Sequence, residues 1–248
     1  MANGVTSGYR AVLLDALGTL VELEPPWPLL RRTLAARHGV EVSDDEAKDA
    51  MLAEMAYYRS HHQEGSDNTS LRALRRRCAG VLQEQLPQTK ALELDELVDV
   101  LLDSIRFMPF LDAAPALAAL RAGGHRLAIV SNWDCSLRSV LGSLGLSGAV
   151  DAIVVSAEVG ALKPDPAIFD AALRALRRDA RDSLFVGDSL ETDVLGAQAA
   201  GLHALLLDRT SAGAATQGGR SPEPAPAEVE RIFSLQELVE RLQAPLHA

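Results

Sequence analysis

The chain has 248 residues, of which 48% are hydrophobic and 23% are charged, and this balance excludes disorder along its whole length. The net charge of −10 and the aromatic content of 4% disfavour nucleic acid or an anionic membrane as a partner, because both bind clustered positive charge. No stretch reaches the about 18 apolar residues that span a membrane, and residues 1–10 lack the apolar segment of a signal peptide. We therefore expect a cytoplasmic protein in which Cys78 and Cys135 are reduced thiols.

The first predicted element is a strand over residues 11–14, Ala-Val-Leu-Leu, which ends directly at Asp15. Consecutive apolar residues without alternation are typical of a strand covered on both faces, as in parallel sheets wrapped by helices. Ligands bind such sheets at the carboxyl ends of the strands, which is where Asp15 is expected. On this stretch alone, a role for Asp15 in capping the following turn is equally open.

Prolines at positions 25, 26 and 28 separate this strand from a long helical region. Apolar spacing predicts helices from Leu29 to about Arg106, and Ser43 with Glu46 three residues later forms a capping box. Further helices are expected from about positions 71 and 92, without a strand before Phe107. We predict an all-helical domain over residues 23–107, inserted into a core made of residues 1–22 and 108–248.

The remainder of the chain alternates between helix and strand. Strands are predicted over residues 126–130, 152–155, 183–186 and 203–207, and helices over residues 114–122, 166–176 and 194–200. This alternation indicates an α/β fold with a doubly wound parallel sheet. Residues 210–228, rich in Gly, Ala, Pro and Ser, are expected to form a flexible loop within the core. Ile232-Phe233 and a helix over 235–242 then close the domain.

Polar residues follow the later strands at the points where these strands end. They are Ser131 and Asn132, then Lys163, then Asp188 and Asp193. Because the strands are expected to be parallel, these residues and Asp15 should meet at one edge of the sheet. Carboxylates are ligands for Mg²⁺, and a lysine can neutralise a phosphate, so the set suits phosphoryl transfer.

Each of these residues also has a simpler structural interpretation. Asp134 can cap the helix that follows the Ser131 strand, and Lys163 can be a solvated loop residue. Asp165 and Pro166 have the residue types of a helix cap and a first helical position. The chemical interpretation therefore depends on the whole set.

The order of Asp15, Ser131, Lys163-Pro164, Gly187-Asp188 and Asp193 resembles the four motifs of the haloacid dehalogenase-like hydrolase superfamily. The resemblance covers residues 11 to about 207, and the helical insert resembles the cap of its subfamily IA. Within the superfamily, Asp-Ala-Leu-Gly-Thr-Leu, Ser-Asn-Trp-Asp and Lys-Pro-Asp-Pro-x-Ile-Phe are similar to the third type of haloacid dehalogenase-like hydrolase domain-containing proteins.

This resemblance implies a role for each motif residue. Asp15 would be the nucleophile that forms an aspartyl intermediate, Ser131 would hydrogen-bond the transferring group, and Lys163 would neutralise charge on both. The Mg²⁺ ligands would be Asp15, the backbone carbonyl of Leu17, and Asp188, with Asp193 as a further ligand or as support. Thr19 would orient the nucleophile, and Asn132 would contact the substrate.

Leu17 departs from the family pattern, because phosphatases of the superfamily that act on alcohol esters carry an Asp general acid there. A general acid contributes about 10²- to 10⁴-fold, so an ordinary ester should turn over slowly unless the cap supplies a proton. The cap candidates are Arg59, His61 and His62, which are also ordinary surface residues. Arg72, Arg75 and Arg76 share one helical face and form either a solvated stripe or an attraction for anions.

Three functions follow from this departure. We expect a Mg²⁺-dependent phosphohydrolase of a small anionic metabolite whose leaving group needs little protonation, in a monomer or homodimer. A 2-haloacid dehalogenase is the alternative, since these enzymes also lack the second Asp, although Asp188 and Asp193 would place negative charge near an expelled halide. A phosphate-binding regulatory protein with weak catalysis is the third possibility.

Overall fold

The computed structural model describes residues 8–209 and 228–243, which divide by their contacts into two units. The first unit comprises residues up to 22, 109–132 and from 136 onward, and the second comprises residues 23–108 and 133–135. The expected loop over residues 210–228 falls outside the described part except for Glu228. No helix in the described part is both long and apolar enough to cross a membrane.

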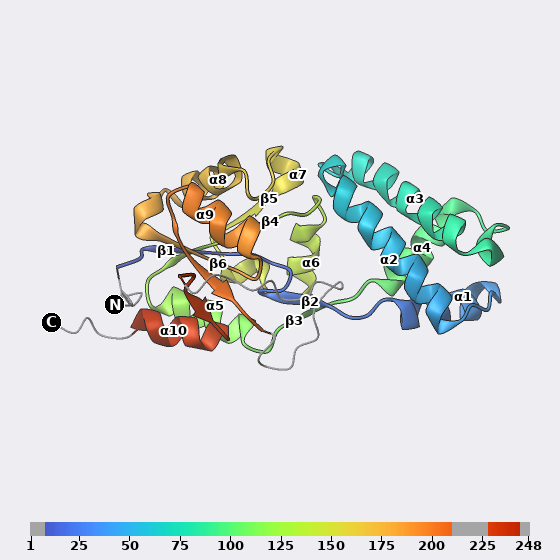
Figure 1. The fold of residues 1–248 in the computed structure, drawn as a ribbon, viewed down its shortest axis with the longest axis horizontal. Helices are drawn as coiled ribbons and strands as arrows, with labels where there is room; N and C mark the ends of the chain where they lie inside the picture. Colours follow the sequence, from blue (N-terminus) through green and yellow to red (C-terminus); the bar gives the residue numbers. More distant parts are fainter. Residues whose placement is uncertain (1–7, 210–227, 244–248) are drawn as a thin grey trace. The chain divides into compact units, whose positions relative to one another are not determined.

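The first unit is built on a parallel sheet, as the sequence predicts, and this sheet has six strands (Figure 1). The strand order is β5-β4-β1-β6-β7-β8, so β1 is a central strand with neighbours on both sides. The strands are β1 (Ala11–Leu14), β4 (Arg126–Ser131), β5 (Ala152–Val155), β6 (Ser183–Gly187), β7 (His203–Leu207) and β8 (Arg231–Ile232). All four residues of β1 are fully buried, which explains their continuous apolar character.

Helices cover both faces of this sheet (Figure 1). They are α5 (Ala113–Ala122), α6 (Leu137–Ser143), α7 (Ser156–Val159), α8 (Pro166–Leu176), α9 (Gly196–Ala199) and α10 (Leu235–Gln243). On one face, Ile168 and Phe169 of α8 pack with Leu13 and Phe185 in a single apolar cluster. Asp165 caps α8 by accepting a hydrogen bond from the Ala167 amide at 2.9 Å, with Pro166 at the first helical position, as predicted.

The helix predicted over residues 194–200 begins earlier than expected. A π-helical turn, η5 (Leu190–Leu195), precedes α9. The Ser189 carbonyl accepts the amides of both Asp193 and Val194, at 3.1 and 3.2 Å, and the Ser189 hydroxyl accepts the Thr192 amide at 3.3 Å. These polar contacts widen the turn, and apolar periodicity gives no signal for them.

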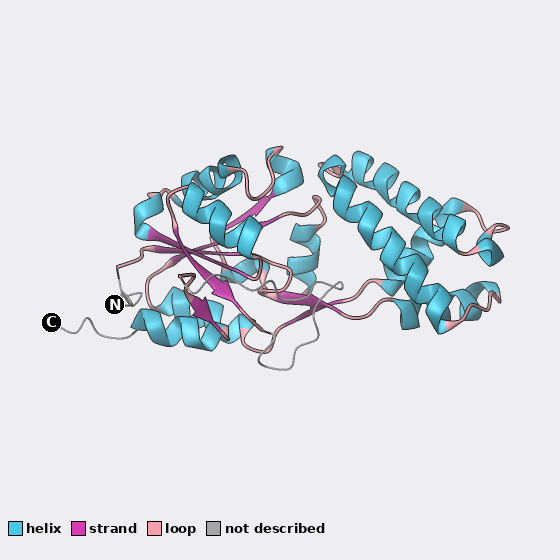
Figure 2. Cartoon of the chain, in the orientation of Figure 1, coloured by secondary structure: helices cyan, strands magenta, loops and turns pink. Residues whose placement is uncertain are grey.

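The second unit consists of helices between the two segments that connect it to the first (Figure 2). The helices are α1 (Trp27–His38), α2 (Asp44–His61), α3 (Asn68–Gln85) and α4 (Leu94–Ser104), with short 3₁₀ turns η1 (His62–Glu64) and η2 (Pro87–Thr89). The predicted capping box is present, since Ser43 accepts the Glu46 amide at 3.2 Å and Glu46 accepts the Ser43 amide at 2.7 Å. The connecting segments β2 (Val21–Leu23) and β3 (Phe107–Pro109) form a two-stranded sheet that the sequence did not predict.

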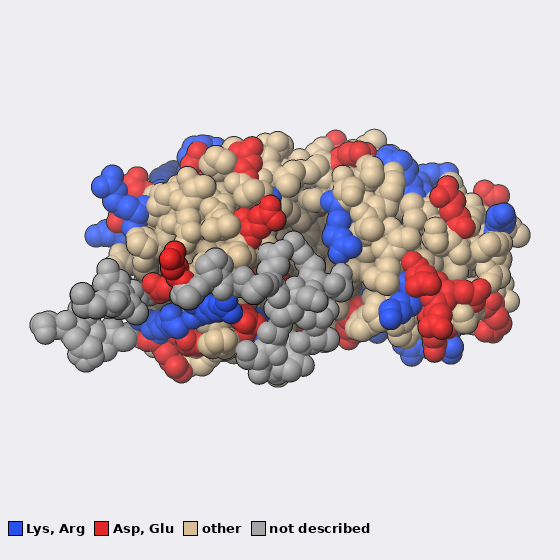
Figure 3. Space-filling model, viewed as in Figure 1, with Lys and Arg blue, Asp and Glu red and all other residues tan. Residues whose placement is uncertain are grey.

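Charged side chains of both signs are interspersed on the face drawn in Figure 3. In the second unit, Arg76 pairs with Asp95 and Arg77 pairs with Glu64. Exposed ion pairs of this kind contribute about 0–1 kcal/mol each. These two arginines are therefore part of an ordinary solvated surface.

Candidate active site

Strand register explains why residues distant in sequence meet beyond the carboxyl ends of the strands. Leu14 is paired with Ile129 on β4 and with Val186 on β6. Asp15 follows Leu14, and its amide donates to the Val186 carbonyl at 2.9 Å. One residue beyond Leu14, and two residues beyond Ile129 and Val186, the chain places the polar side chains of Asp15, Ser131 and Asp188 at the same edge.

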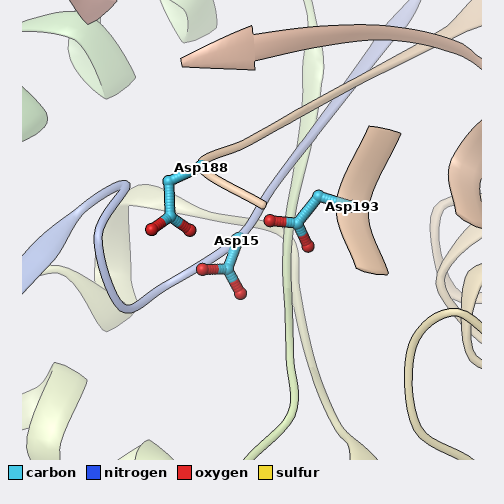
Figure 4. A group of neighbouring side chains, drawn as sticks. All are labelled: Asp15, Asp188 and Asp193. Carbon is cyan, nitrogen blue, oxygen red and sulfur yellow. The ribbon is translucent and has the colours of Figure 1, made fainter. Parts of the chain in front are cut away.

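Three carboxylates converge at this edge, those of Asp15, Asp188 and Asp193 (Figure 4). One oxygen from each lies within 4.8 Å of the others. Asp15 and Asp193 are buried, whereas Asp188 is exposed. So close a group of acids is unfavourable without a cation, and an all-oxygen set is what a hard divalent cation binds.

Lys163 is the positive charge within this cluster. Its Nζ donates to Asp15 Oδ1 at 2.5 Å and to Asp193 Oδ1 at 2.6 Å, and the residue is only 2% exposed. Burial alone would lower the pKa of Lys163, but the two carboxylates raise it above its usual value. The lysine is therefore held charged beside Asp15, and the alternative of a solvated loop lysine is wrong.

The carboxyl groups respond to burial and to one another. Burial raises the pKa of Asp15 to about 6, against the opposing effect of Lys163. Desolvation, together with the charges of Asp15 and Asp193, raises the pKa of Asp188 to about 8. With all three acids ionised, Lys163 leaves a net charge of −2, which a divalent cation would neutralise.

Ser131 and Asn132 reach the cluster from the end of β4. The Ser131 hydroxyl donates to Asp15 Oδ1 at 3.1 Å. The Asn132 side chain pairs with the backbone of Lys163, donating to its carbonyl at 2.9 Å and accepting its amide at 2.7 Å. Asn132 thus fixes the loop carrying the lysine, and the Lys163-Pro164 bond in that loop is cis.

Two glycines make room for the acids. Gly18 has φ +87°, and a Cβ there would lie 2.5 Å from Asp188 Cγ. A Cβ on Gly187 would lie 2.6 Å from Asp193 Cβ. Both positions therefore exclude a side chain, and at Gly18 the left-handed backbone disfavours one as well.

The turn after Asp15 contains Leu17 and Thr19. The Leu17 side chain is 37% exposed, and Thr19 is fully buried with a hydroxyl that has no hydrogen-bond partner among the described residues.

Both carboxylate oxygens of Asp193 accept hydrogen bonds. Oδ1 accepts one from Lys163 Nζ at 2.6 Å, and Oδ2 accepts one from the Ser189 amide at 3.0 Å.

The remaining predicted residues lie in the second unit. Arg59 and His61 are in the last turn of α2, and His62 begins η1. The N-cap residue of α6 is Ser136 and not Asp134 as expected, and Asp134 Oδ2 accepts the Tyr58 hydroxyl at 2.7 Å.

Comparison with known proteins agrees with this geometry. The family model described as haloacid dehalogenase-like hydrolase matches residues 9–201. Haloacid dehalogenase-like hydrolase domain-containing protein 3 of Mus musculus is 31% identical over 209 residues, which cover 80% of this chain and 81% of that protein.

Two solved structures with the same fold have different activities. A phosphatase of this family from Thermococcus onnurineus has a TM-score of 0.62 and 26% identity, covering 94% of this chain and 98% of its own. A 2-haloacid dehalogenase from Pseudomonas syringae pv. Tomato DC3000 has a TM-score of 0.61, with the same identity and coverage. Similarity of fold therefore does not separate the two reactions, and the choice depends on the residues of the site.

Proposed function

The chain belongs to the haloacid dehalogenase-like hydrolase family, and from this premise we propose that it is a Mg²⁺-dependent phosphohydrolase of a small anionic metabolite. The observation that carries the proposal is the cluster of three carboxylates around the buried Lys163 ammonium. It unites a nucleophile, a cation site and a fixed positive charge, which are the requirements of phosphoryl transfer.

Asp15 is the proposed nucleophile. A carboxylate oxygen attacks phosphorus as the bond to the leaving oxygen breaks, giving an aspartyl-phosphate that water then hydrolyses. Ser131 and Lys163, both bonded to Asp15 Oδ1, hold the carboxylate in one orientation and would contact the phosphoryl oxygens. Asn132 supports this arrangement by fixing the Lys163 backbone, and it remains, with Thr19, a proposed substrate-binding residue.

The proposed Mg²⁺ ligands are Asp15, Asp188 and the backbone carbonyl of Leu17. We assign Asp193 a supporting role and not that of a metal ligand, because its two oxygens already accept hydrogen bonds from Lys163 and the Ser189 amide. When bound, the cation would supply charge neutralisation between nucleophile and phosphate. Asp188 fits a ligand because its carboxylate lies within 4.8 Å of the other two acids and the residue is exposed.

Leu17 narrows the proposed substrate class. Its hydrocarbon side chain cannot protonate a leaving oxygen, and it is exposed where an acid would be needed. Leaving groups that depart as stable anions, such as the carboxylate of an acyl phosphate or the phosphate of an anhydride, do not need that proton. We therefore place acyl phosphates and anhydrides ahead of alkyl phosphates.

A 2-haloacid dehalogenase is the second candidate, favoured by the absence of the second Asp and by the similarity to the Pseudomonas enzyme. Asp188 and Asp193 argue against it, because they place negative charge where a halide anion would be released. A protein that binds phosphate and does not turn it over is the third.

The test is phosphate release from acetyl phosphate and from an alkyl phosphate, with Mg²⁺ or with EDTA, in wild type and Asp15→Asn. We expect release that requires Mg²⁺, favours acetyl phosphate by about 10²-fold or more, and falls at least about 10³-fold in the variant. Full activity in Asp15→Asn would exclude the nucleophile. Halide release from 2-chloropropionate that EDTA does not affect would establish the dehalogenase instead, and phosphate binding by calorimetry without turnover would establish the binding protein.

A further inference from the structure

The turn that follows the nucleophile is closed by its own backbone. The Ala16 carbonyl accepts the amides of Leu20 and Val21 at 2.8 and 2.9 Å, and the Gly18 amide donates to the Val21 carbonyl at 2.8 Å. These bonds fix the shape of the turn. They leave the carbonyls of Thr19 and Leu20 to bind groups outside it.

Arg209, beyond the end of β7, binds one of these two carbonyls. Its Nη2 donates to the Thr19 carbonyl at 2.7 Å, and the Leu20 carbonyl accepts the Phe110 amide at 3.0 Å. The guanidinium also lies 3.8 Å from the centroid of the Phe110 ring. One arginine therefore contacts both the turn and the segment beside it.

Asp112 holds the guanidinium in this position. Arg209 donates to both of its oxygens, at 2.9 and 3.2 Å, and the Arg209 side chain is 13% exposed. Asp112 precedes α5 and also accepts the Leu235 amide at the start of α10, at 2.9 Å. A two-point bond between a planar guanidinium and a carboxylate fixes direction as well as distance.

We propose that Arg209 is a positioning residue that holds the turn after Asp15, and with it the Leu17 carbonyl as a proposed metal ligand. The inference rests on the proposed function for the identity of the metal. Gly18, between Leu17 and Thr19, is already packed against Asp188, so a displacement of Thr19 is transmitted to a turn with little free space. Groups that orient metal ligands in this way typically change metal affinity about 10- to 100-fold when removed.

Arg241 provides a matched control in the same unit. Its Nη2 also binds one carboxylate and one backbone carbonyl, those of Glu237 at 2.6 Å and Arg231 at 2.7 Å. These contacts lie on α10 and β8 and do not include the turn. Arg241→Ala should therefore reproduce the loss of a structural arginine without the proposed effect on the site.

The experiment compares wild type, Arg209→Ala, Arg209→Lys and Arg241→Ala. Hydrogen exchange of the amides of residues 16–21 is followed by mass spectrometry in metal-free protein, and Mg²⁺ affinity by calorimetry. We expect about tenfold faster exchange and about tenfold weaker Mg²⁺ binding in both Arg209 variants. Lysine should not rescue the site, because it keeps the positive charge but cannot make the two-point hydrogen bond of a guanidinium. Arg241→Ala should match wild type in both measurements.

Wild-type exchange or wild-type Mg²⁺ affinity in a folded Arg209 variant would overturn the proposal, as would equal changes in Arg241→Ala. If Arg209→Ala does not fold, Arg209→Lys carries the same test. A wild-type protein that binds no Mg²⁺ would contradict the proposed function, and the exchange measurement alone would then decide whether Arg209 holds the turn.

Discussion

Both units of the molecule contain buried carboxylates, and two of them, Asp15 and Glu54, differ in what faces them. Asp15 in the first unit is 5% exposed and is bonded to the Lys163 ammonium. Glu54 of α2 in the second unit is 3% exposed and lies beside the Cys78 thiol. Burial raises the pKa of Glu54 to about 7, so near neutral pH it is about half protonated.

This difference separates a carboxylate suited to chemistry from one that packs a helical domain. The proposed nucleophile must be ionised, and the buried ammonium beside Asp15 favours that form. Glu54 lies on the inward stripe of α2 with Ala47, Ala50 and Met51, and it reduces its burial cost by taking up a proton. The comparison can be tested from both sides.

Removing the counter-charge in the first unit should have the largest effect. Lys163→Met leaves Asp15 and Asp193 buried without their cation, and loss of one partner of a buried ion pair typically costs about 3–5 kcal/mol. The free energy of unfolding by urea measures this loss. Lys90→Met, at an exposed position, should change it by less than about 0.5 kcal/mol, and an equally small change at Lys163 would contradict the role of the lysine.

Neutralising Glu54, the buried acid of the second unit, should raise the free energy of unfolding instead of lowering it. The pKa of Glu54 rises from 4.5 to about 7 on folding, so the native state binds the proton more tightly and loses stability as pH rises between these values. Glu54→Gln should therefore be nearly neutral at pH 4.5 and stabilising by up to about 3 kcal/mol at pH 8.

Urea unfolding across this pH range, compared with Glu84→Gln at an exposed position of α3, checks the pH dependence. A Glu54→Gln effect that does not change with pH would show that the acid is ionised throughout. The contrast with Asp15 would then disappear.

The smallest of these effects concerns another buried acid, Asp134, which accepts a hydrogen bond from the neutral Tyr58 hydroxyl. Tyr58→Phe removes the hydroxyl that donates to Asp134 at 2.7 Å, and a buried acceptor that loses a donor costs about 2 kcal/mol. Thermal unfolding should show a lower melting temperature for Tyr58→Phe than for Tyr57→Phe, whose hydroxyl accepts a single bond from Arg77 at 3.1 Å. Equal melting temperatures would mean that Asp134 does not depend on Tyr58.

The sequence predicts the core of the fold because its signals there are local. The apolar run before Asp15, the capping box at Ser43 and the cap at Asp165 each specify structure within a few residues. Asp15, Lys163 and Asp193 meet because parallel strands align their ends, and strand order along the chain is enough to indicate that edge.

What the sequence does not predict depends on contacts across long separations. Arg209 meets Thr19 across 190 residues, and Tyr58 meets Asp134 across 76. Neither arginine after a strand nor tyrosine on a helix carries a local signal of its partner. The burial of Glu54 could have been predicted, because it lies seven residues after Ala47 on the same face of the helix. A charged residue is, however, normally assigned to the surface.

The helical insert leaves the chain almost where it enters. The Glu24 amide donates to the Arg106 carbonyl at 2.9 Å, so the two ends of a segment of more than eighty residues lie side by side. A segment whose ends are held so close adds little loop-closure entropy beyond its own folding, whatever its length. The insert could thus change in length without altering the strand order of the sheet that carries Asp15.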